Sequence, residues 1–95
     1  MIKRMELIKV IDAKYVEDYK IEFTFNDGKK KVIDLKDELW GEVFEPLKNK
    51  DYFKKFKLNA FTIEWANGAD FSPEFLYYYG EEKKDQVKNY SNRVK

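Results

Sequence analysis

The segment KIEFTFNDGKKKVIDL, residues 20–35, constrains the fold more than any other part of the chain. Its apolar residues recur at every second position, a period typical of a strand with one buried face. The turn NDGK follows, where Gly28 supplies the positive φ that a tight hairpin needs. The alternation then resumes. The apolar positions on the two arms are Ile21, Phe23, Phe25, Ile33 and Leu35. The pattern therefore predicts an antiparallel β-hairpin.

The preceding segment LIKVIDAKY, Leu7 to Tyr15, also favours a strand, because it is rich in β-branched residues. Neither of its faces is cleanly polar. We expect the chain to turn between this strand and the hairpin, with Glu17 and Asp18 at the apex. Three antiparallel strands in a meander are therefore predicted.

The middle of the chain, KDELWGEVFEPLKNKDYFKKF, changes period and predicts two short helices. Asp37 is placed to cap a turn that carries Leu39 and Trp40. Gly41 interrupts the pattern, and Pro46 suits the first turn of a helix. Further along, one predicted helical face holds Tyr52, Phe53 and Phe56.

The closing part of the fold begins with AFTIEW, which alternates again. Phe61, Ile63 and Trp65 are expected to point inward, and Thr62 and Glu64 outward. The turn ANG and a short return strand ADF complete a second hairpin. A helix then starts at Ser72-Pro73-Glu74, an N-cap, a first helical position and a first-turn anion. Phe71, Phe75 and Leu76 are expected to pack on the sheet, and Gly80 to end the helix.

Together these elements predict an α+β fold: a small antiparallel sheet, formed by a three-stranded meander plus a second hairpin, packed with short helices. The chain has 95 residues, which is enough for one core. We expect a single α+β domain over residues 1–80. The charged segment at residues 81–95 is expected to form a C-terminal tail.

Composition excludes several kinds of chemistry. The chain contains neither cysteine nor histidine, so a thiolate, zinc or iron–sulfur site is disfavoured, as is the commonest general base. Its two serines lie in a helix cap and in the tail, and no glycine-rich phosphate loop is present. We therefore expect no enzyme activity and no cofactor. The N-terminus resembles neither a signal peptide nor a membrane span, which favours a cytoplasmic protein.

Carboxylates are the remaining candidates for chemistry. On a single helix Glu38, Glu42 and Glu45 could share one face and bind a hard cation. The alternative is a solvated acidic face, which Gly41 favours by interrupting the helix. Asp34 and Asp70 lie at the ends of two predicted strands and could form a carboxylate pair, or each could accept backbone hydrogen bonds in a turn.

The aromatic residues give the best indication of a partner surface. Trp40, Trp65 and the run Tyr77–Tyr79 could line such a surface. Three consecutive residues cannot all face inward on a helix, so at least one tyrosine is expected to be exposed, and aromatic residues are favoured at the centres of interfaces. The alternative is an irregular helix end with packed rings and wet hydroxyls. The predicted partner-binding residues are Trp65, Asp70, Tyr77, Tyr78 and Tyr79.

Nucleic acid is a weaker alternative. The net charge is +1, which gives no broad basic face. Local clusters occur at Lys29–Lys31 and Lys54–Lys57, the second beside Tyr52 and Phe53. Stacking combined with phosphate contact is conceivable there. Solvated side chains on a hairpin and a helix explain the same clusters.

The segments FNDGKKKVIDL, FEPL and FTIEWANGADFSPEFLY resemble the bacterial Domain of Unknown Function 2442 family, over residues 8–79. A proline commonly follows the tryptophan in that family, whereas this chain has Ala66. The positions that match the family pattern most specifically are Trp65, Asn67, Gly68, Asp70, Pro73, Leu76 and Tyr77.

This resemblance implies a small bacterial α+β protein and brings no catalytic residue. Family members are often encoded beside another small protein, in an arrangement like a toxin–antitoxin pair. Some members carry an additional helix-turn-helix domain, which this chain lacks. We therefore expect a non-enzymatic protein-interaction module, for which the resemblance suggests the role of accessory or antitoxin-like member of a two-gene cassette. Its partner would be another small protein, with a homo-oligomer as a further possibility. The alternatives are a ligand-binding protein or enzyme that uses carboxylates, and a weak nucleic-acid-associated regulator.

Overall fold

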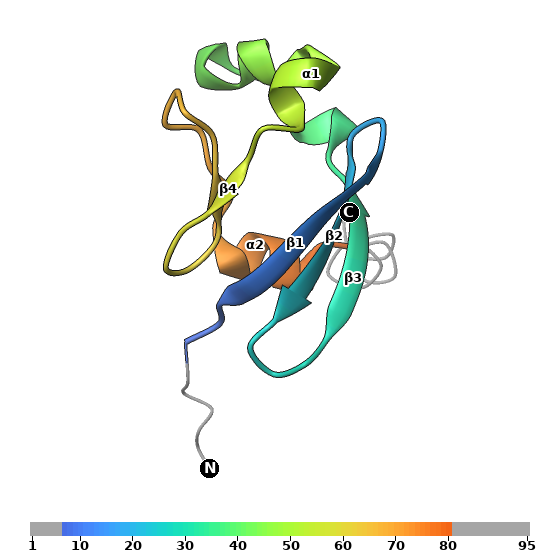
Figure 1. Ribbon diagram of the computed structural model, residues 1–95, viewed down its shortest axis with the longest axis vertical. Coiled ribbons are helices and arrows are strands. Elements are labelled where there is room, and N and C mark those ends of the chain that lie inside the picture. Colours follow the sequence, from blue (N-terminus) through green and yellow to red (C-terminus); the bar gives the residue numbers. More distant parts are fainter. Residues whose placement is uncertain (1–6, 81–95) are drawn as a thin grey trace, which may run out of the picture.

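The computed structural model describes residues 7–80, in which a three-stranded sheet is followed by short helical segments, a small hairpin and a last helix (Figure 1). The strands are β1 (Val10–Glu17), β2 (Lys20–Phe25), β3 (Lys30–Asp34), β4 (Lys57–Leu58) and β5 (Ile63–Glu64). The helical segments are the 3₁₀ helices η1 (Lys36–Glu38) and η2 (Glu42–Lys48) and the α-helices α1 (Lys50–Phe53) and α2 (Pro73–Tyr78). The predicted α+β class, with a three-stranded antiparallel sheet and a second hairpin, is confirmed. The predicted tail at 81–95 lies outside the described residues.

The hairpin of β2 and β3 forms as the alternation predicts. Ile21 pairs with Ile33 and Phe23 with Lys31 in an antiparallel register. The backbone N–H of Phe25 donates to the Lys29 carbonyl at 2.8 Å across the turn. Gly28 adopts a φ of 92°, a conformation that strains other L-residues. The predicted turn is therefore confirmed.

Strand β1 begins and ends later than the predicted range of residues 7–15. Its register with β2 shifts between Val10 and Asp12, so Ile11 sits in a bulge and is 52% exposed. This bulge explains why neither face of the segment reads as cleanly polar. The following turn lies at Asp18 and Tyr19, one residue beyond the predicted apex, and Asp18 has a positive φ of 46°.

The middle of the chain holds three short helical segments rather than two, and Pro46 lies inside η2 rather than in its first turn. In a 3₁₀ helix the N–H at Pro46 would bond the carbonyl of Val43, but proline has no N–H. The side-chain amide of Asn67 donates to that carbonyl instead, at 2.9 Å. Helix α1 ends at Phe53, so Phe56 lies beyond the helix.

The second hairpin differs in detail from the prediction. Strand β4 pairs with β5, although Lys57 and Leu58 lie between the predicted helical segment and the predicted strand and were assigned to neither. Phe61 and Thr62 also exchange places: Phe61 is 50% exposed and Thr62 is 5% exposed. The reason is that the side-chain oxygen of Asn59 accepts hydrogen bonds from both of their backbone N–H groups. The strand therefore starts only at Ile63.

The closing turn and cap follow the sequence. The N–H of Gly68 donates to the Trp65 carbonyl at 2.9 Å, and the return strand is reduced to one bridge between Glu64 and Asp70. The hydroxyl of Ser72 accepts from the N–H of Phe75 at 3.1 Å and so caps α2. The helix ends before Gly80, which has a φ of 85°.

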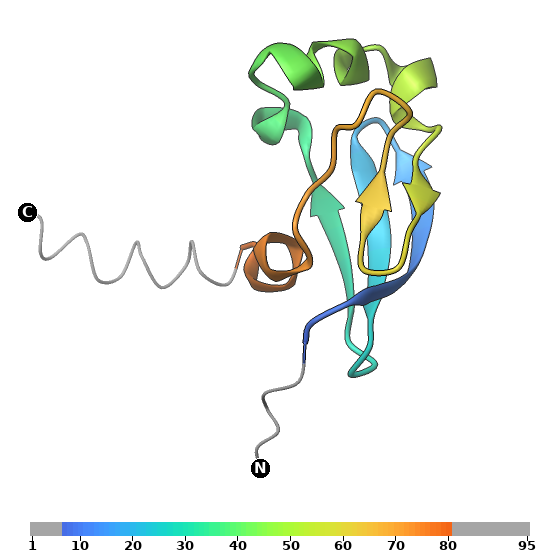
Figure 2. The same ribbon diagram turned by 90° about the vertical axis from the view of Figure 1, so that its left-hand side faces the viewer.

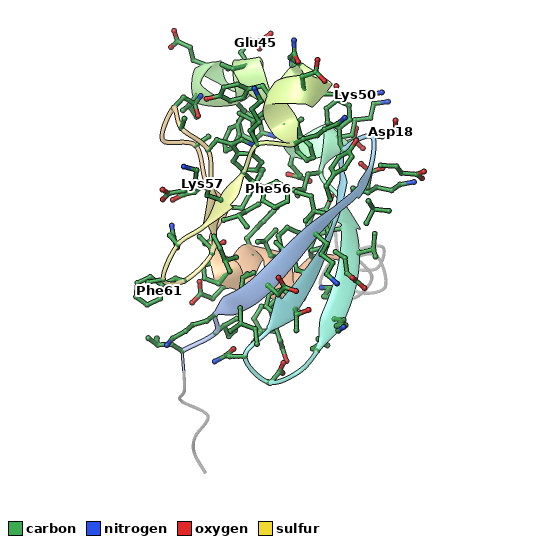
Figure 3. The ribbon with its side chains drawn as sticks, viewed as in Figure 1. Asp18, Glu45, Lys50, Phe56, Lys57 and Phe61 are labelled. Carbon is green, nitrogen blue, oxygen red and sulfur yellow. The ribbon has the colours of Figure 1, made fainter. Side chains whose placement is uncertain are left out.

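The core lies between the three-stranded sheet and the β4–β5 hairpin. Figure 2 shows the hairpin in front of β2, with the helical segments across one end and α2 beside β3. Figure 3 shows Phe56 pointing inward between β4 and β1, and Phe61 pointing away from the body. The largest fully buried side chains include Phe23, Phe25, Phe53, Leu35, Leu47 and Leu76. No helix within residues 7–80 is long and apolar enough to cross a bilayer.

Candidate partner-binding surface

The three consecutive tyrosines of α2 point in different directions. Tyr77 reaches the tip of the β2–β3 hairpin, where its hydroxyl donates to Asp27 Oδ2 at 2.5 Å. Tyr79 reaches η1, where its hydroxyl donates to Glu38 Oε2 at 2.9 Å. Tyr78 is 45% exposed. Two of the predicted partner-binding tyrosines therefore hold the helix in place, and Tyr78 is the one whose ring is open to a partner.

Lys31 secures the C-terminal end of α2. Its ammonium group donates to the carbonyl oxygens of Leu76, Tyr77 and Tyr79 at 3.1, 2.6 and 2.8 Å. The Leu76 carbonyl also accepts the backbone N–H of Tyr79, at 3.3 Å. Carbonyls at the end of a helix lack a full set of intrahelical partners, and a cation there is also favoured by the helix dipole. The side chain of Lys31 thus belongs to the packing of the helix.

Helix α2 packs over the face of the sheet that carries the core. Its Leu76 is fully buried, and the ring of Tyr77 lies edge-on to the ring of Phe25 in β2, with centroids 5.1 Å apart. Figure 2 shows α2 beside β3. Tyr77 is held by Asp27, before β3, and Tyr79 by Glu38, after it, so the end of the helix is fixed beyond both ends of that strand.

These contacts change the ionisation of the groups involved. Burial, and then the hydrogen bond to Glu38, raises the pKa of Tyr79 to about 12. The hydrogen bond to Asp27 raises the pKa of Tyr77, and the same bond lowers the pKa of Asp27. All three shifts favour the states in which a neutral tyrosine donates to a carboxylate.

Trp65 belongs to the core and not to the predicted partner surface. It is 2% exposed, and its indole N–H donates to the Phe53 carbonyl at 2.9 Å. Its ring packs between Phe53, Phe56 and Phe71. The alternation within residues 60–65 did place Trp65 inward, and that prediction is confirmed. A side chain with so little exposed area offers nothing to a partner.

Asp34 and Asp70 do not form a carboxylate pair. Asp34 accepts the backbone N–H of Lys36 at 3.0 Å and lines a cavity of about 200 Å³ beside Lys50. Asp70 is exposed and lines a different cavity of about 440 Å³, with Leu7 and Phe61. The alternative in which each acts locally holds for Asp34, because it satisfies a donor in the turn after β3.

The three glutamates also separate. Glu38 accepts the Tyr79 hydroxyl, while Glu45 pairs with Lys48 at 3.3 Å in η2. Gly41, with a φ of 96°, divides the segment as the sequence indicates. Figure 3 shows Glu45 at the outer end of the molecule. Among residues 7–80, no three acidic side chains gather closely enough to hold a metal ion.

The first basic cluster is divided in the same way. Lys31 bonds to α2, and the ammonium of Lys29 lies 4.6 Å from the centre of the Tyr77 ring. Lys54 in the second cluster lies 5.3 Å from the centre of the Tyr15 ring. These lysines contact aromatic rings and carbonyls of their own fold, which explains much of the clustering without a nucleic acid.

Four exposed apolar side chains lie in α2 and in the segment that its ring contacts hold. Within α2, Phe75 and Tyr78 are 38% and 45% exposed, and they are neighbours at a spacing of three. Trp40, between η1 and η2, is 71% exposed, and Val43, in the first turn of η2, is 45% exposed. We call these four residues the Trp40 face. The sequence had indicated Trp40 and Tyr78, whereas Val43 and the outer edge of Phe75 were missed.

A ladder of ring contacts joins the two parts of the Trp40 face. Phe44 stacks on Phe71 with centroids 5.0 Å apart, Phe71 stacks on Phe75 at 5.7 Å, and Phe75 contacts Tyr79 at 5.3 Å. Tyr79 in turn bonds to Glu38. Segment 38–44 and helix α2 are therefore connected at both ends of the ladder, and Figure 2 shows them on the same side of the sheet.

Comparison with known proteins identifies the family of this chain and no activity. A family model described as a protein of unknown function, DUF2442, matches residues 10–82. The chain belongs to the DUF2442 family. A search of curated proteins and a search of solved structures found no match. In this DUF2442 protein the family-like residues Trp65, Asn67 and Gly68 serve the core and a turn, so the match itself indicates no binding residue.

Proposed function

We propose that this DUF2442 protein is a non-enzymatic protein-interaction module of the bacterial cytoplasm, and that it binds another small protein through the Trp40 face. The observation that carries the proposal is the exposure of Trp40, at 71%, on a segment held against α2. A large aromatic side chain left in water on a fixed support is typical of an interface centre.

The exposed neighbours support the same reading. Tyr78 and Phe75 add aromatic area on α2, and Val43 adds apolar area beside Trp40. Several exposed apolar groups on segments that are held together favour association more than one isolated group does. The role of accessory or antitoxin-like member of a two-gene cassette rests on the family resemblance, and it names the expected partner: the protein encoded by the adjacent reading frame.

The experiment that tests this proposal is affinity capture from a lysate of the source organism. The bait carries an N-terminal tag, the lysate is treated with nuclease, and the captured proteins are weighed by mass spectrometry. We expect one small protein at near-equal stoichiometry. Capture should be lost with Trp40→Ala and with Tyr78→Ala, while the thermal midpoint of each variant stays close to that of the wild type, because both side chains are exposed.

Phe61→Ala is the matched control. Phe61 is also aromatic and is 50% exposed, but it lies in the β4–β5 hairpin and points away from the body of the protein (Figure 3). Its removal should leave capture unchanged. Equal loss of the partner with Phe61→Ala would refute the assignment of the Trp40 face, and the absence of any stoichiometric partner would refute the interaction module.

A further inference from the structure

The acidic residues of this protein are unevenly placed, and the Trp40 face lies among them. The chain as a whole has a net charge of +1. Residues 37–45 and 72–80, which carry the Trp40 face, contain no lysine or arginine. Their acidic residues are Asp37, Glu38, Glu42, Glu45 and Glu74. The two segments therefore bring only negative side chains to the Trp40 face, although Lys36 and Lys48 lie beside Leu39 at its border.

Most of this negative charge is available to a partner. Asp37, Glu42 and Glu74 are exposed, and no ion pair joins them to a basic group within residues 7–80. Glu45 pairs with Lys48, but both side chains are more than half exposed, so the pair is weak and easily exchanged. The ammonium of Lys31 is turned to the carbonyls of α2 and is committed there.

We infer that the Trp40 face takes a basic amphipathic segment of its partner, one whose apolar side chains cover Trp40 and Phe75 while its lysines or arginines meet the acidic rim. This inference rests on the proposed function and specifies the chemistry of the partner. An apolar centre with a charged rim fixes both the place and the orientation of such a segment. An acidic segment with the same apolar residues would be repelled.

A set of synthetic peptides tests the inference, whatever the identity of the partner. The probe is a helical peptide of about 18 residues, roughly five turns, with leucines on one face and lysines on the other. Two matched peptides carry glutamate or glutamine in place of lysine. Binding to the full-length protein and to each variant is followed by the fluorescence anisotropy of a dye-labelled peptide. In the wild type, protection of Trp40 from acrylamide quenching shows where the peptide lies.

We expect the lysine peptide to bind and the glutamate peptide to fail. Trp40→Ala should weaken binding of the lysine peptide about tenfold or more. The double variant Glu42→Lys/Glu45→Lys should also weaken it about tenfold, and added salt should do the same to the wild type. Asp12→Lys/Glu17→Lys is the matched control, because Glu17 also pairs at a spacing of three, with Lys20, on a different surface. Its binding should stay within about twofold of the wild type.

The remaining outcomes separate this inference from the proposed function. Equal binding of all three peptides, lost with Trp40→Ala, would overturn the basic character of the partner but leave the interaction module in place. The inference would be overturned if Trp40→Ala left peptide binding unchanged, or if no peptide bound. The capture experiment would then decide the function alone. A dimer of this chain that dissociates with Trp40→Ala would identify a second copy as the occupant of the Trp40 face, and this result would also overturn the inference.

Discussion

The ammonium nitrogen of Lys31 lies 2.6 Å from the carbonyl oxygen of Tyr77, 46 positions away in the sequence. A cation on the edge strand β3 thus closes the C-terminal end of α2, a helix of six residues. A helix this short is unstable by itself, because it has few internal hydrogen bonds to offset nucleation. Its position, and with it the exposed ring of Tyr78, depends on contacts with the sheet.

Replacing Lys31 by methionine should therefore destabilise the protein. The substitution keeps much of the apolar stem but removes the ammonium group that donates to three carbonyls at the helix end. We expect a loss of about 1–3 kcal/mol in the free energy of unfolding. Urea denaturation followed by circular dichroism measures this loss. Lys30→Met is the control, because Lys30 is exposed on the other face of β3. If both variants lost the same stability, capping by Lys31 would not be the cause.

Tyr79 should make the protein sensitive to alkali. Its pKa is raised to about 12 in the folded protein, against about 10 in an unfolded chain. The neutral hydroxyl is favoured by the fold, so its contribution to stability is complete below pH 10 and is lost as the pH rises from 10 towards 12.

The difference in thermal midpoint between wild type and Tyr79→Phe, measured from pH 8 to about pH 11.5, isolates this effect from the lysines that titrate in both proteins. The advantage of the wild type should shrink above pH 10. A difference that stays constant across the range would show that Tyr79 ionises as freely in the folded protein as in the unfolded chain.

The bond between Tyr77 and Asp27 gives a prediction at the acid end. Tyr77→Phe removes the main cause of the lowered pKa of Asp27, so that pKa should rise towards 3.8. A lowered pKa contributes stability above pH 3.8 that is lost as the pH falls through the folded value, and this loss should be smaller in the variant. NMR titration of the carboxyl carbons measures the shift. Tyr78→Phe should leave Asp27 unchanged; an equal shift there would exclude the direct bond.

The sequence predicted the parts of this fold that are decided by near neighbours. The turn at Gly28, the cap at Ser72 and the inward direction of Trp65 each follow from a few adjacent residues, and each is present. The bulge at Ile11 was visible only as an alternation without a clean polar face. Local chemistry of this kind survives in the fold because it agrees with the global arrangement.

The candidate surface was harder to predict, because it depends on partners far apart in the chain. Nothing near Lys31 indicates that it caps a helix 46 positions later. Similarly, the free carbonyl that Pro46 leaves on Val43 is met by Asn67, which lies 24 positions away. Without such contacts, Tyr77, Tyr78 and Tyr79 could not be sorted into two anchors and one exposed ring. The aromatic pattern also placed Trp65 among the predicted partner-binding residues, although the alternation of its strand pointed it inward.

The two tryptophans therefore offer the sharpest test of how the chain divides core from surface. Trp65→Ala should lower the free energy of unfolding by about 3–5 kcal/mol, because it opens a cavity among Phe53, Phe56 and Phe71 and removes the bond to the Phe53 carbonyl. Trp40→Ala should change it by less than about 0.5 kcal/mol, because that ring is largely in water. Both values come from urea denaturation under the same conditions. In the wild type, acrylamide should quench the emission of Trp40 and spare that of Trp65, so the Trp65→Ala protein, where it folds, should be quenched more completely. A cost above about 2 kcal/mol for Trp40→Ala would place that ring in the packing of η1 and η2, and the Trp40 face would then have lost its central residue.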